Sequence, residues 1–275
     1  MMEAFLPAQL IFITDPSDPR VEPFLAVSER DLVGRHGLFI AEGEVVLRHL
    51  LTSSLCEPVA LLAAADRVER LKSLMGDQVP DVPVYVAEQR VMDAIVGFPI
   101  HRGLLGLGRR RTPPTGQALL AGLGDRALVM AVHGIGNHDN MGGLFRNAAA
   151  FGVDAVLLDA SCCDPLYRKA IRVSVGATLI TPFARLAPEE DLIALLQGAG
   201  FDAVALSPSG AVDLKAFAPG ARTAVIFGAE GPGLPADLLG RCRTVQIPMA
   251  SGFDSLNVAT TSGIVLHHLA NARAD

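Results

Sequence analysis

Residues 127–159 read ALVMAVHGIGNHDNMGGLFRNAAAFGVDAVLLD, and this stretch decides the fold class. The apolar run 127–133 predicts a buried strand. Residues 141–152 have the spacing of a helix that ends at Gly152, and 154–159 predicts a second strand. A strand, a helix and a strand in this order form the unit from which parallel sheets are built.

The same alternation continues toward the C-terminus. Acidic residues in the first turn and a closing glycine predict a helix over 188–200. The further elements that we expect are strands over 202–206, 223–228 and 244–249 and a long final helix over 255–272. Short apolar strands that alternate with helices are typical of a parallel sheet covered on both faces, so we predict an α/β fold.

The N-terminal part predicts a second, smaller α/β unit. Its expected elements are helices over 42–51, 66–75 and 88–96 and strands over 57–64, 82–87 and 103–108. Basic residues, proline and glycine are mixed directly after it, which is typical of a linker. We therefore predict an N-terminal domain over 1–108, a linker over 109–124 and a C-terminal domain over 125–275.

Composition excludes several classes of protein. Half of the 275 residues are hydrophobic, yet no apolar run reaches the roughly 18 residues that span a bilayer. The N-terminus has no basic region before its short apolar stretch, so we expect a cytoplasmic protein without a signal peptide or a membrane contact. The four cysteines lack the spacing of a disulfide framework or a CxxC site, and we interpret Cys162 and Cys163 as small buried residues.

Charge is unevenly distributed in this chain of net charge −6. Two windows contain no Asp or Glu, one between Asp93 and Asp125 and the other between Asp164 and Glu189. The arginines in these windows that we expect to contact nucleic-acid phosphates are Arg102, Arg109, Arg110, Arg111, Arg168 and Arg172. The alternative is that each window is a solvated surface.

Familiar cofactor and hydrolase motifs are absent. No GxGxxG or P-loop pattern follows a predicted strand, and no GxSxG elbow occurs. His133 and His138 have no third ligand at metal spacing, so we expect no metal. The loops that follow the strands 127–133, 223–228 and 244–249 are instead rich in glycine and small polar residues. In a parallel sheet, such loops form the ligand site.

These three loops resemble the signature of the SpoU/TrmH family, within the SPOUT class of methyltransferases. The matching residues are Asn140, Gly142 and Arg146 in the first motif, Gly228, Glu230, Gly231 and Gly233 in the second, and Ile247-Pro248-Met249 with Ser255-Leu256-Asn257 in the third. RVSVGA (172–177) resembles the family's Ser-x-Gly-Ala element. His138 stands where many members carry proline two residues before the motif-one asparagine.

The resemblance implies an enzyme that transfers a methyl group from S-adenosylmethionine to a ribose 2′-hydroxyl of tRNA or rRNA. It also implies a deep trefoil knot and a homodimer formed through the C-terminal domain. The N-terminal domain resembles the L30e-like RNA-binding domain that many members carry. A separate N-terminal domain suggests an extended substrate, which favours rRNA slightly over tRNA.

Residue roles follow from the same resemblance. The expected catalytic residues are Arg146, Asn140, Glu230, Ser255 and Asn257, and the expected cofactor-binding residues are Phe227, Gly228, Gly233, Ile247, Met249 and Leu256. We expect Glu230 to pair with the Arg146 guanidinium. Alternatively, Asn140 and Ser255 serve only as helix caps. The rival functions are a base-methylating SPOUT enzyme and a non-catalytic RNA-binding protein.

Overall fold

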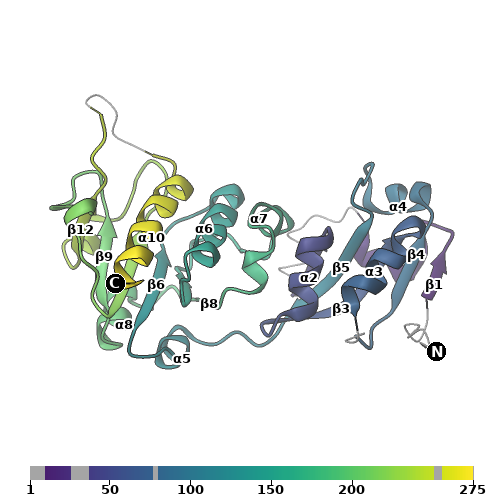
Figure 1. Cartoon of the computed structure of the whole chain (residues 1–275), viewed down its shortest axis with the longest axis horizontal. Helices are drawn as coiled ribbons and strands as arrows, with labels where there is room; N and C mark the ends of the chain where they lie inside the picture. The colour runs from purple at the N-terminus through teal and green to yellow at the C-terminus, as the bar shows by residue number, and fades with distance from the viewer. Residues whose placement is uncertain (1–9, 26–36, 77–79, 251–255, 275) are drawn as a thin grey trace. The chain divides into compact units, whose positions relative to one another are not determined.

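The computed structural model describes residues 10–25, 37–76, 80–250 and 256–274, and its helices and strands form two compact units (Figure 1). The first unit comprises residues 1–111 together with 166–180, and the second comprises 112–165 together with 181–275. The α/β fold class with a parallel sheet is confirmed. The division differs from the predicted one because the segment 166–180 belongs to the N-terminal unit.

The first unit contains a mixed five-stranded sheet in the order β1-β4-β3-β5-β2. Its strands are β1 (Leu10–Ile13), β2 (Leu38–Glu42), β3 (Cys56–Ala64), β4 (Val84–Ala87) and β5 (Leu104–Arg110). Its helices are η1 (Pro19–Phe24), α2 (Glu44–Thr52), η2 (Ala65–Arg67), α3 (Val68–Met75), α4 (Gln89–Val96), α7 (Arg168–Val173) and η3 (Ala177–Leu179). Strand β5 runs antiparallel to both of its neighbours.

Glycines in β5 allow α2 to pack closely on this sheet. A Cβ atom on Gly106 would lie 2.6 Å from Leu47 Cδ1, and one on Gly108 would lie 3.0 Å from Leu50 Cδ1, both in α2. These side chains are buried, so a larger residue at either glycine would displace the core. Residues 109 and 110, expected in the linker, continue β5 in the structure.

The second unit contains a seven-stranded sheet, parallel throughout, in the order β10-β12-β9-β11-β6-β7-β8. Its strands are β6 (Ala127–Val132), β7 (Ala155–Leu158), β8 (Phe183–Arg185), β9 (Asp202–Leu206), β10 (Val212–Asp213), β11 (Arg222–Phe227) and β12 (Arg243–Gln246). Its helices are α5 (Gly116–Ala121), α6 (His138–Ala150), α8 (Leu192–Gly198), η4 (Leu214–Ala216), α9 (Ala236–Leu239) and α10 (Val258–Ala274).

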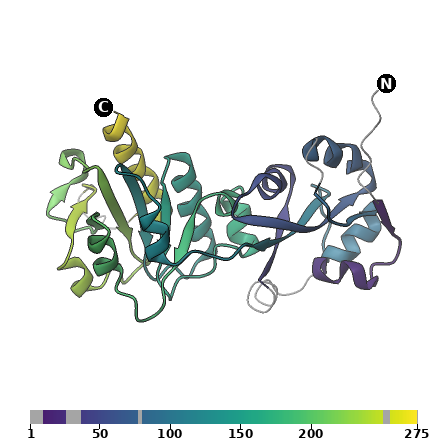
Figure 2. The same cartoon turned by 90° about the horizontal axis from the view of Figure 1, so that it is seen from below.

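Helices cover both faces of this sheet. On one face, residues of α5, α8 and α9 join a buried cluster with Val129, Leu157 and Ile226. On the other face Phe145 of α6 meets the Phe183 ring edge to face at 5.4 Å, and α10 packs against α6, as Figures 1 and 2 show. A sheet buried on both sides explains why its strands are continuous apolar runs.

An ion pair holds α7 in the first unit. Arg168 Nη2 lies 2.7 Å from Glu42 Oε2, and the guanidinium carbon lies 4.8 Å from the centre of the Phe98 ring. The side chains of Arg168 and Glu42 are only 25% and 11% exposed. The Arg168 guanidinium, which we expected to contact a phosphate, is therefore bound to Glu42. The same ion pair connects the segment 166–180 to residues 1–111.

We expect Arg168→Ala to lower the free energy of unfolding by about 2 kcal/mol, because it leaves the Glu42 carboxylate without its charged hydrogen-bond partner. Urea denaturation followed by circular dichroism measures the change. Arg172→Ala is the matched control, since Arg172 is exposed on the same helix and its replacement should change stability by less than about 0.5 kcal/mol. Equal effects of the two substitutions would contradict a structural role for the pair.

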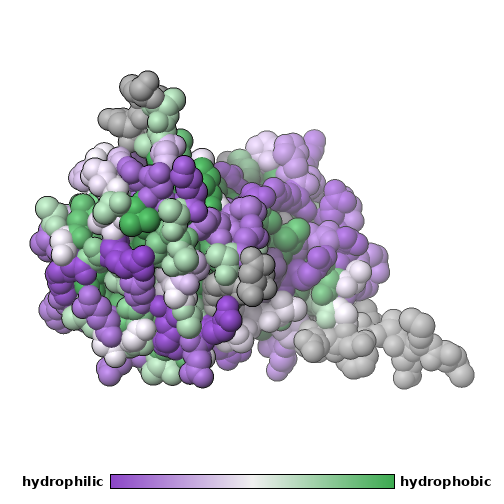
Figure 3. All heavy atoms as spheres, turned by 60° about the vertical axis from the view of Figure 1, so that its left-hand side comes forward, coloured by the Kyte–Doolittle hydropathy of each residue, from purple (hydrophilic) through white to green (hydrophobic). Residues whose placement is uncertain are grey.

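Among the described residues, no helix combines the length and hydrophobicity needed to cross a membrane. On the face turned to the viewer in Figure 3, hydrophobic side chains are interspersed with hydrophilic ones.

Candidate functional site

A cavity of about 410 Å³ lies in the second unit, beyond the carboxyl ends of β9, β11 and β12. The residues that line it are Leu206, Ser207, Pro208, Phe227, Gly228, Ala229, Glu230, Gly231, Gly233, Val245, Ile247, Met249, Leu256, Asn257, Val258 and Thr261. The three strands are neighbours in the sheet and parallel, so their ends meet at one edge. All six residues expected to bind a cofactor therefore line one cavity.

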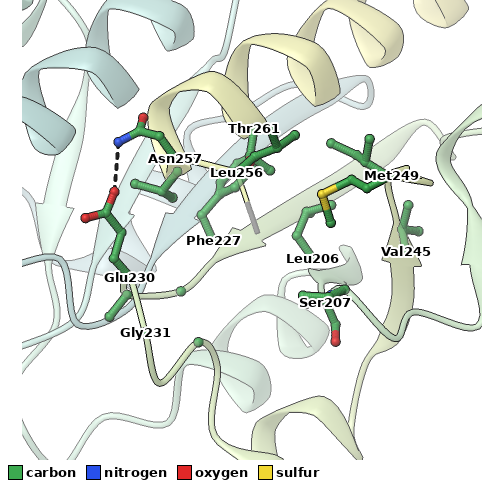
Figure 4. Close-up of a pocket in the computed structure, with 16 residues that line it drawn as sticks. Leu206, Ser207, Phe227, Glu230, Gly231, Val245, Met249, Leu256, Asn257 and Thr261 are labelled. Atoms are coloured by element: carbon green, nitrogen blue, oxygen red, sulfur yellow. Dashed lines mark hydrogen bonds between the residues drawn. The ribbon is translucent and has the colours of Figure 1, made fainter. Parts of the chain in front are cut away.

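The carboxylate and amide groups of this cavity lie on one side of it. Figure 4 shows Glu230 and Asn257 there, and Met249, Val245 and Leu206 on the other side together with Ser207. A ligand with an apolar portion and a polar portion matches this arrangement.

Backbone atoms form the cavity wall at the second motif. A Cβ atom on Gly228 would lie 2.6 Å from the Gly233 carbonyl carbon and 2.8 Å from the Leu234 nitrogen. Gly231 and Gly233 have φ values of +87° and +68°, a region that side chains rarely allow. The loop closes on itself through the Gly233 N–H, which donates to the Ala229 carbonyl at 3.1 Å. A glycine at position 228 is thus required by close approach of two backbone segments.

Asn257 connects the first, second and third motifs. Its Nδ2 donates to Asn140 Oδ1 at 2.9 Å and to Glu230 Oε1 at 2.8 Å. Its Oδ1 accepts from the N–H groups of Ala259 at 2.9 Å and Thr260 at 3.2 Å, which caps the N-terminus of α10. Because the helix fixes Oδ1, the amide nitrogen must face the two acceptors.

We expect Asn257→Ala to destabilise the protein by about 1 kcal/mol more than Asn257→Ser. Serine retains a helix cap, whereas neither side chain replaces the amide donor to Asn140 and Glu230. The difference between the free energies of unfolding of the two variants, measured with denaturant, gives the contribution of the helix cap. Equal stability of the two variants would show that the Oδ1 contacts do not stabilise α10.

Helix α6 begins three residues earlier than the sequence predicted. Asn137 is its N-cap, because its Oδ1 accepts from the Asp139 N–H at 2.8 Å and the Asn140 N–H at 3.4 Å. Asn140 is therefore not the cap but an internal residue, 6% exposed, that faces Asn257. His138 occupies the first helical position, where proline is also well accommodated, so the helix start tolerates the exchange.

Arg146 is exposed and does not line the cavity. The expected ion pair with Glu230 is not formed, since Glu230 Oε1 accepts from Asn257 instead. The reason is helical geometry. Six residues correspond to roughly 600°, which turns Arg146 away from the face that carries Asn140. Asn147 occupies the buried side and donates to the Ala259 carbonyl at 2.7 Å and to Ser262 Oγ at 2.9 Å.

The remaining expected arginines fall into two groups, both in the first unit. Arg109 and Arg111 both lie near the Glu57 carboxylate, at 3.9 Å and 3.2 Å, and Arg110 is half-buried in β5. Arg102 and Arg172 are exposed.

Ser255 lies outside the described residues. Within the described part of the chain, no group of three His, Cys, Asp or Glu side chains is placed to hold a metal. All four cysteines are free thiols, and burial raises the pKa of Cys162 to about 12 and that of Cys163 to about 11. These thiols are protonated at neutral pH. Cys162 is buried as predicted, whereas Cys163 is only half-buried.

Sequence reasoning missed one wall of the cavity. Leu206 is the last residue of β9, Ser207 and Pro208 follow it, and Thr261 lies one turn into α10. The signal for the first three is their position at the carboxyl end of a predicted strand. That signal becomes specific only when β9 is known to lie between β11 and β12.

Comparisons with known proteins agree with this arrangement. Residues 127–267 match the model of the SpoU rRNA Methylase family. An uncharacterized tRNA/rRNA methyltransferase of Mycobacterium bovis is 38% identical over 93% of this chain and 90% of its own length. The 23S rRNA (adenosine(1067)-2'-O)-methyltransferase of Streptomyces azureus is 25% identical over 94% of this chain and 95% of its own.

A solved structure shares the fold. The crystal structure of an AdoMet-bound rRNA methyltransferase from Sinorhizobium meliloti superposes with a TM-score of 0.78 and covers 96% of this chain and 98% of its own, at 24% identity. The family match covers the strands, loops and helices that build the cavity. The chain belongs to the SpoU rRNA Methylase family.

Proposed function

We propose that this protein transfers a methyl group from S-adenosylmethionine to a ribose 2′-hydroxyl in structured RNA. The observation that carries the proposal is that Asn257, which lines the cavity, bonds to Glu230 of the second motif and to Asn140 of the first. The 2′-O-methyltransferase name of the Streptomyces azureus relative supports the ribose as target.

The cavity fits the cofactor. Phe227, Ile247, Met249 and Leu256 offer an apolar surface for an adenine ring, and the glycine loop offers backbone groups at close approach. When bound, S-adenosylmethionine supplies an electrophilic methyl group on a sulfonium sulfur. Glu230 places a carboxylate at the polar end of the same cavity, where it favours a positively charged ligand.

Arg146 is proposed to act on the RNA. A ribose hydroxyl is a weak acid that needs its geometry fixed before it reacts. Arginine stays protonated, with a pKa above about 12, so its role is to grip the phosphate beside the target ribose. The hydroxyl proton then passes to that phosphate or to water. Asn140 and Asn257 orient the loops, and Ser255 is proposed to act beside them.

The N-terminal unit is proposed to recognise the RNA as an L30e-like domain. Arg102, Arg109, Arg110, Arg111 and Arg172 are proposed phosphate contacts, and Arg168 is assigned to its Glu42 ion pair instead. The Streptomyces azureus relative acts on 23S rRNA by its name, which supports rRNA over tRNA.

The C-terminal part is proposed to be knotted and to form a homodimer in the cytoplasm. Its α/β fold matches that of the rRNA methyltransferase from Sinorhizobium meliloti. Ile264 of α10 is 41% exposed and Leu256 beside the cavity is 37% exposed, so apolar side chains are available for a second copy. Such a contact would lie next to the cavity.

The test is methyl transfer from labelled S-adenosylmethionine to unmodified rRNA and, separately, to unmodified tRNA, followed by digestion to nucleosides. We expect label in a 2′-O-methyl nucleoside of the rRNA pool. Label on a base would establish the base-methylating alternative. If S-adenosylmethionine does not bind saturably, the proposed enzymatic function is wrong, and the alternative of a non-catalytic RNA-binding protein is favoured.

A further inference from the structure

A second cavity, of about 550 Å³, lies within the N-terminal unit and has no part in the methyl-transfer site. It is lined by Glu44, Val45, Val46, Arg67, Arg70, His101, Arg102, Leu104, Arg172 and Val175. These residues come from α2, the region of η2 and α3, the loop before β5, and α7 with the turn after it. Four arginines therefore face one carboxylate.

The Glu44 carboxylate accepts hydrogen bonds at both of its oxygens. Glu44 Oε2 accepts from Arg70 Nε at 2.8 Å, and Glu44 Oε1 accepts from Arg48 Nη2 at 3.0 Å and from Arg70 Nη2. The hydrogen bond from Arg70 lowers the pKa of Glu44, so the carboxylate stays ionised at neutral pH. Glu44 is thus occupied by Arg48 and Arg70 and does not reach the other arginines of the cavity.

The side chains of Arg102 and Arg172 have no hydrogen bond or ion pair among the described residues, and the Arg67 side chain has only a distant contact, 3.8 Å, with exposed Asp66. His101 adds a further polar side chain to the lining. Unpaired guanidinium groups that share a cavity repel one another, so their arrangement favours an anion.

The local backbone keeps these arginines in place. Gly43 lies against the stem of Arg102, since a Cβ atom there would be 2.7 Å from Arg102 Cδ. Gly103 lies against the stem of Arg67, since a Cβ atom there would be 2.9 Å from Arg67 Cγ. Both stems rest on backbone that carries no side chain, which reduces their freedom before a ligand binds.

The backbone is also strained at the cavity. Val175 has a φ of +54° and is the sole non-glycine residue with positive φ among the described residues. A β-branched residue rarely adopts this region, and such strained positions cluster at binding sites. The strain lies two residues after α7, which contributes Arg172.

We propose that this cavity binds a phosphate group, gripped by Arg102 and Arg172 with Arg67 beside them. Guanidinium forks bind phosphate oxygens in bidentate pairs, the chemistry that two unpaired arginines supply. The phosphate belongs either to the RNA backbone or to a free phosphorylated molecule. The RNA source rests on the proposed function, whereas phosphate binding itself does not.

The experiment compares wild type, the double variant Arg102→Gln/Arg172→Gln and the control Arg90→Gln. Arg90 is exposed on α4 of the same unit, outside the cavity, and has no partner among the described residues. Inorganic pyrophosphate is titrated by calorimetry. Unmodified rRNA is titrated at several salt concentrations, and S-adenosylmethionine binding is measured alongside as a check on the second unit.

We expect the double variant, but not Arg90→Gln, to bind pyrophosphate at least ~10-fold more weakly than wild type. If the phosphate belongs to RNA, the slope of log affinity against log salt should also fall by roughly 1.4 to 1.8 for the two charges removed. If the double variant loses pyrophosphate binding while its salt slope for rRNA equals that of wild type, the ligand is a free phosphorylated molecule.

The proposal is overturned if wild type binds no pyrophosphate and its RNA slope is the same as that of the double variant. It is also overturned if Arg90→Gln weakens binding as much as the double variant does, because the loss of affinity then follows from the lower net charge and not from the cavity. A protein that binds pyrophosphate here but takes up no S-adenosylmethionine would contradict the proposed function and leave this inference standing.

Discussion

Arg146→Lys should lower the rate of methyl transfer by about 100-fold or more while S-adenosylmethionine binds with unchanged affinity. Lysine keeps the positive charge but loses the planar fork that fixes a phosphate in two directions. Arg146 is exposed, lies outside the lining of the cavity and has no side-chain partner among the described residues, so its replacement should disturb neither the fold nor the proposed cofactor site. Single-turnover kinetics with saturating cofactor measure the effect.

The control is Lys215→Gln, which removes an exposed positive charge elsewhere in the second unit. It should leave the rate unchanged. An equal rate for Arg146→Lys and wild type would remove Arg146 from the proposed mechanism. A parallel loss of cofactor affinity would instead assign it to the cofactor site.

Gly228→Ala should weaken S-adenosylmethionine binding by roughly 10- to 100-fold. The new Cβ atom would meet Gly233 and Leu234 at 2.6–2.8 Å, and these contacts are to backbone atoms that cannot rotate away. The loop must therefore shift, and with it the wall of the cavity that carries Glu230 and Gly231. Calorimetric titration with S-adenosylmethionine measures the affinity.

Gly198→Ala is the matched control, because a Cβ atom at this position in α8 has no neighbour within 4 Å. Its cofactor affinity should equal that of wild type. Thermal unfolding of both variants separates a local shift of the loop from a loss of fold. An unchanged affinity in Gly228→Ala would show that the loop relaxes without cost and that the proposed cofactor wall is not rigid.

Local patterns were sufficient for the main elements of the second unit. Its long strands are apolar runs because both faces of the sheet are buried, and short apolar runs bounded by turn residues and helices reveal them. Short elements escaped this reasoning. Strand β8 has three residues, and α7 has six, too few for a period to be recognised. The start of α6 was misplaced because Asn137 and Asn140 are both good caps, and only the hydrogen bonds distinguish them.

The sequence by itself determined the family and six of the residues that line the proposed cofactor cavity, because Phe227, Gly228, Gly233 and their partners occur in ordered motifs next to predictable strands. Tertiary structure decided which side chains meet. Glu230 bonds to Asn257 and not to Arg146, and Arg168 bonds to Glu42, far away in sequence. Such pairings depend on strand order and on the rotation of each helix, which no local pattern encodes. For the same reason only the fold brings Arg102 and Arg172 to one cavity.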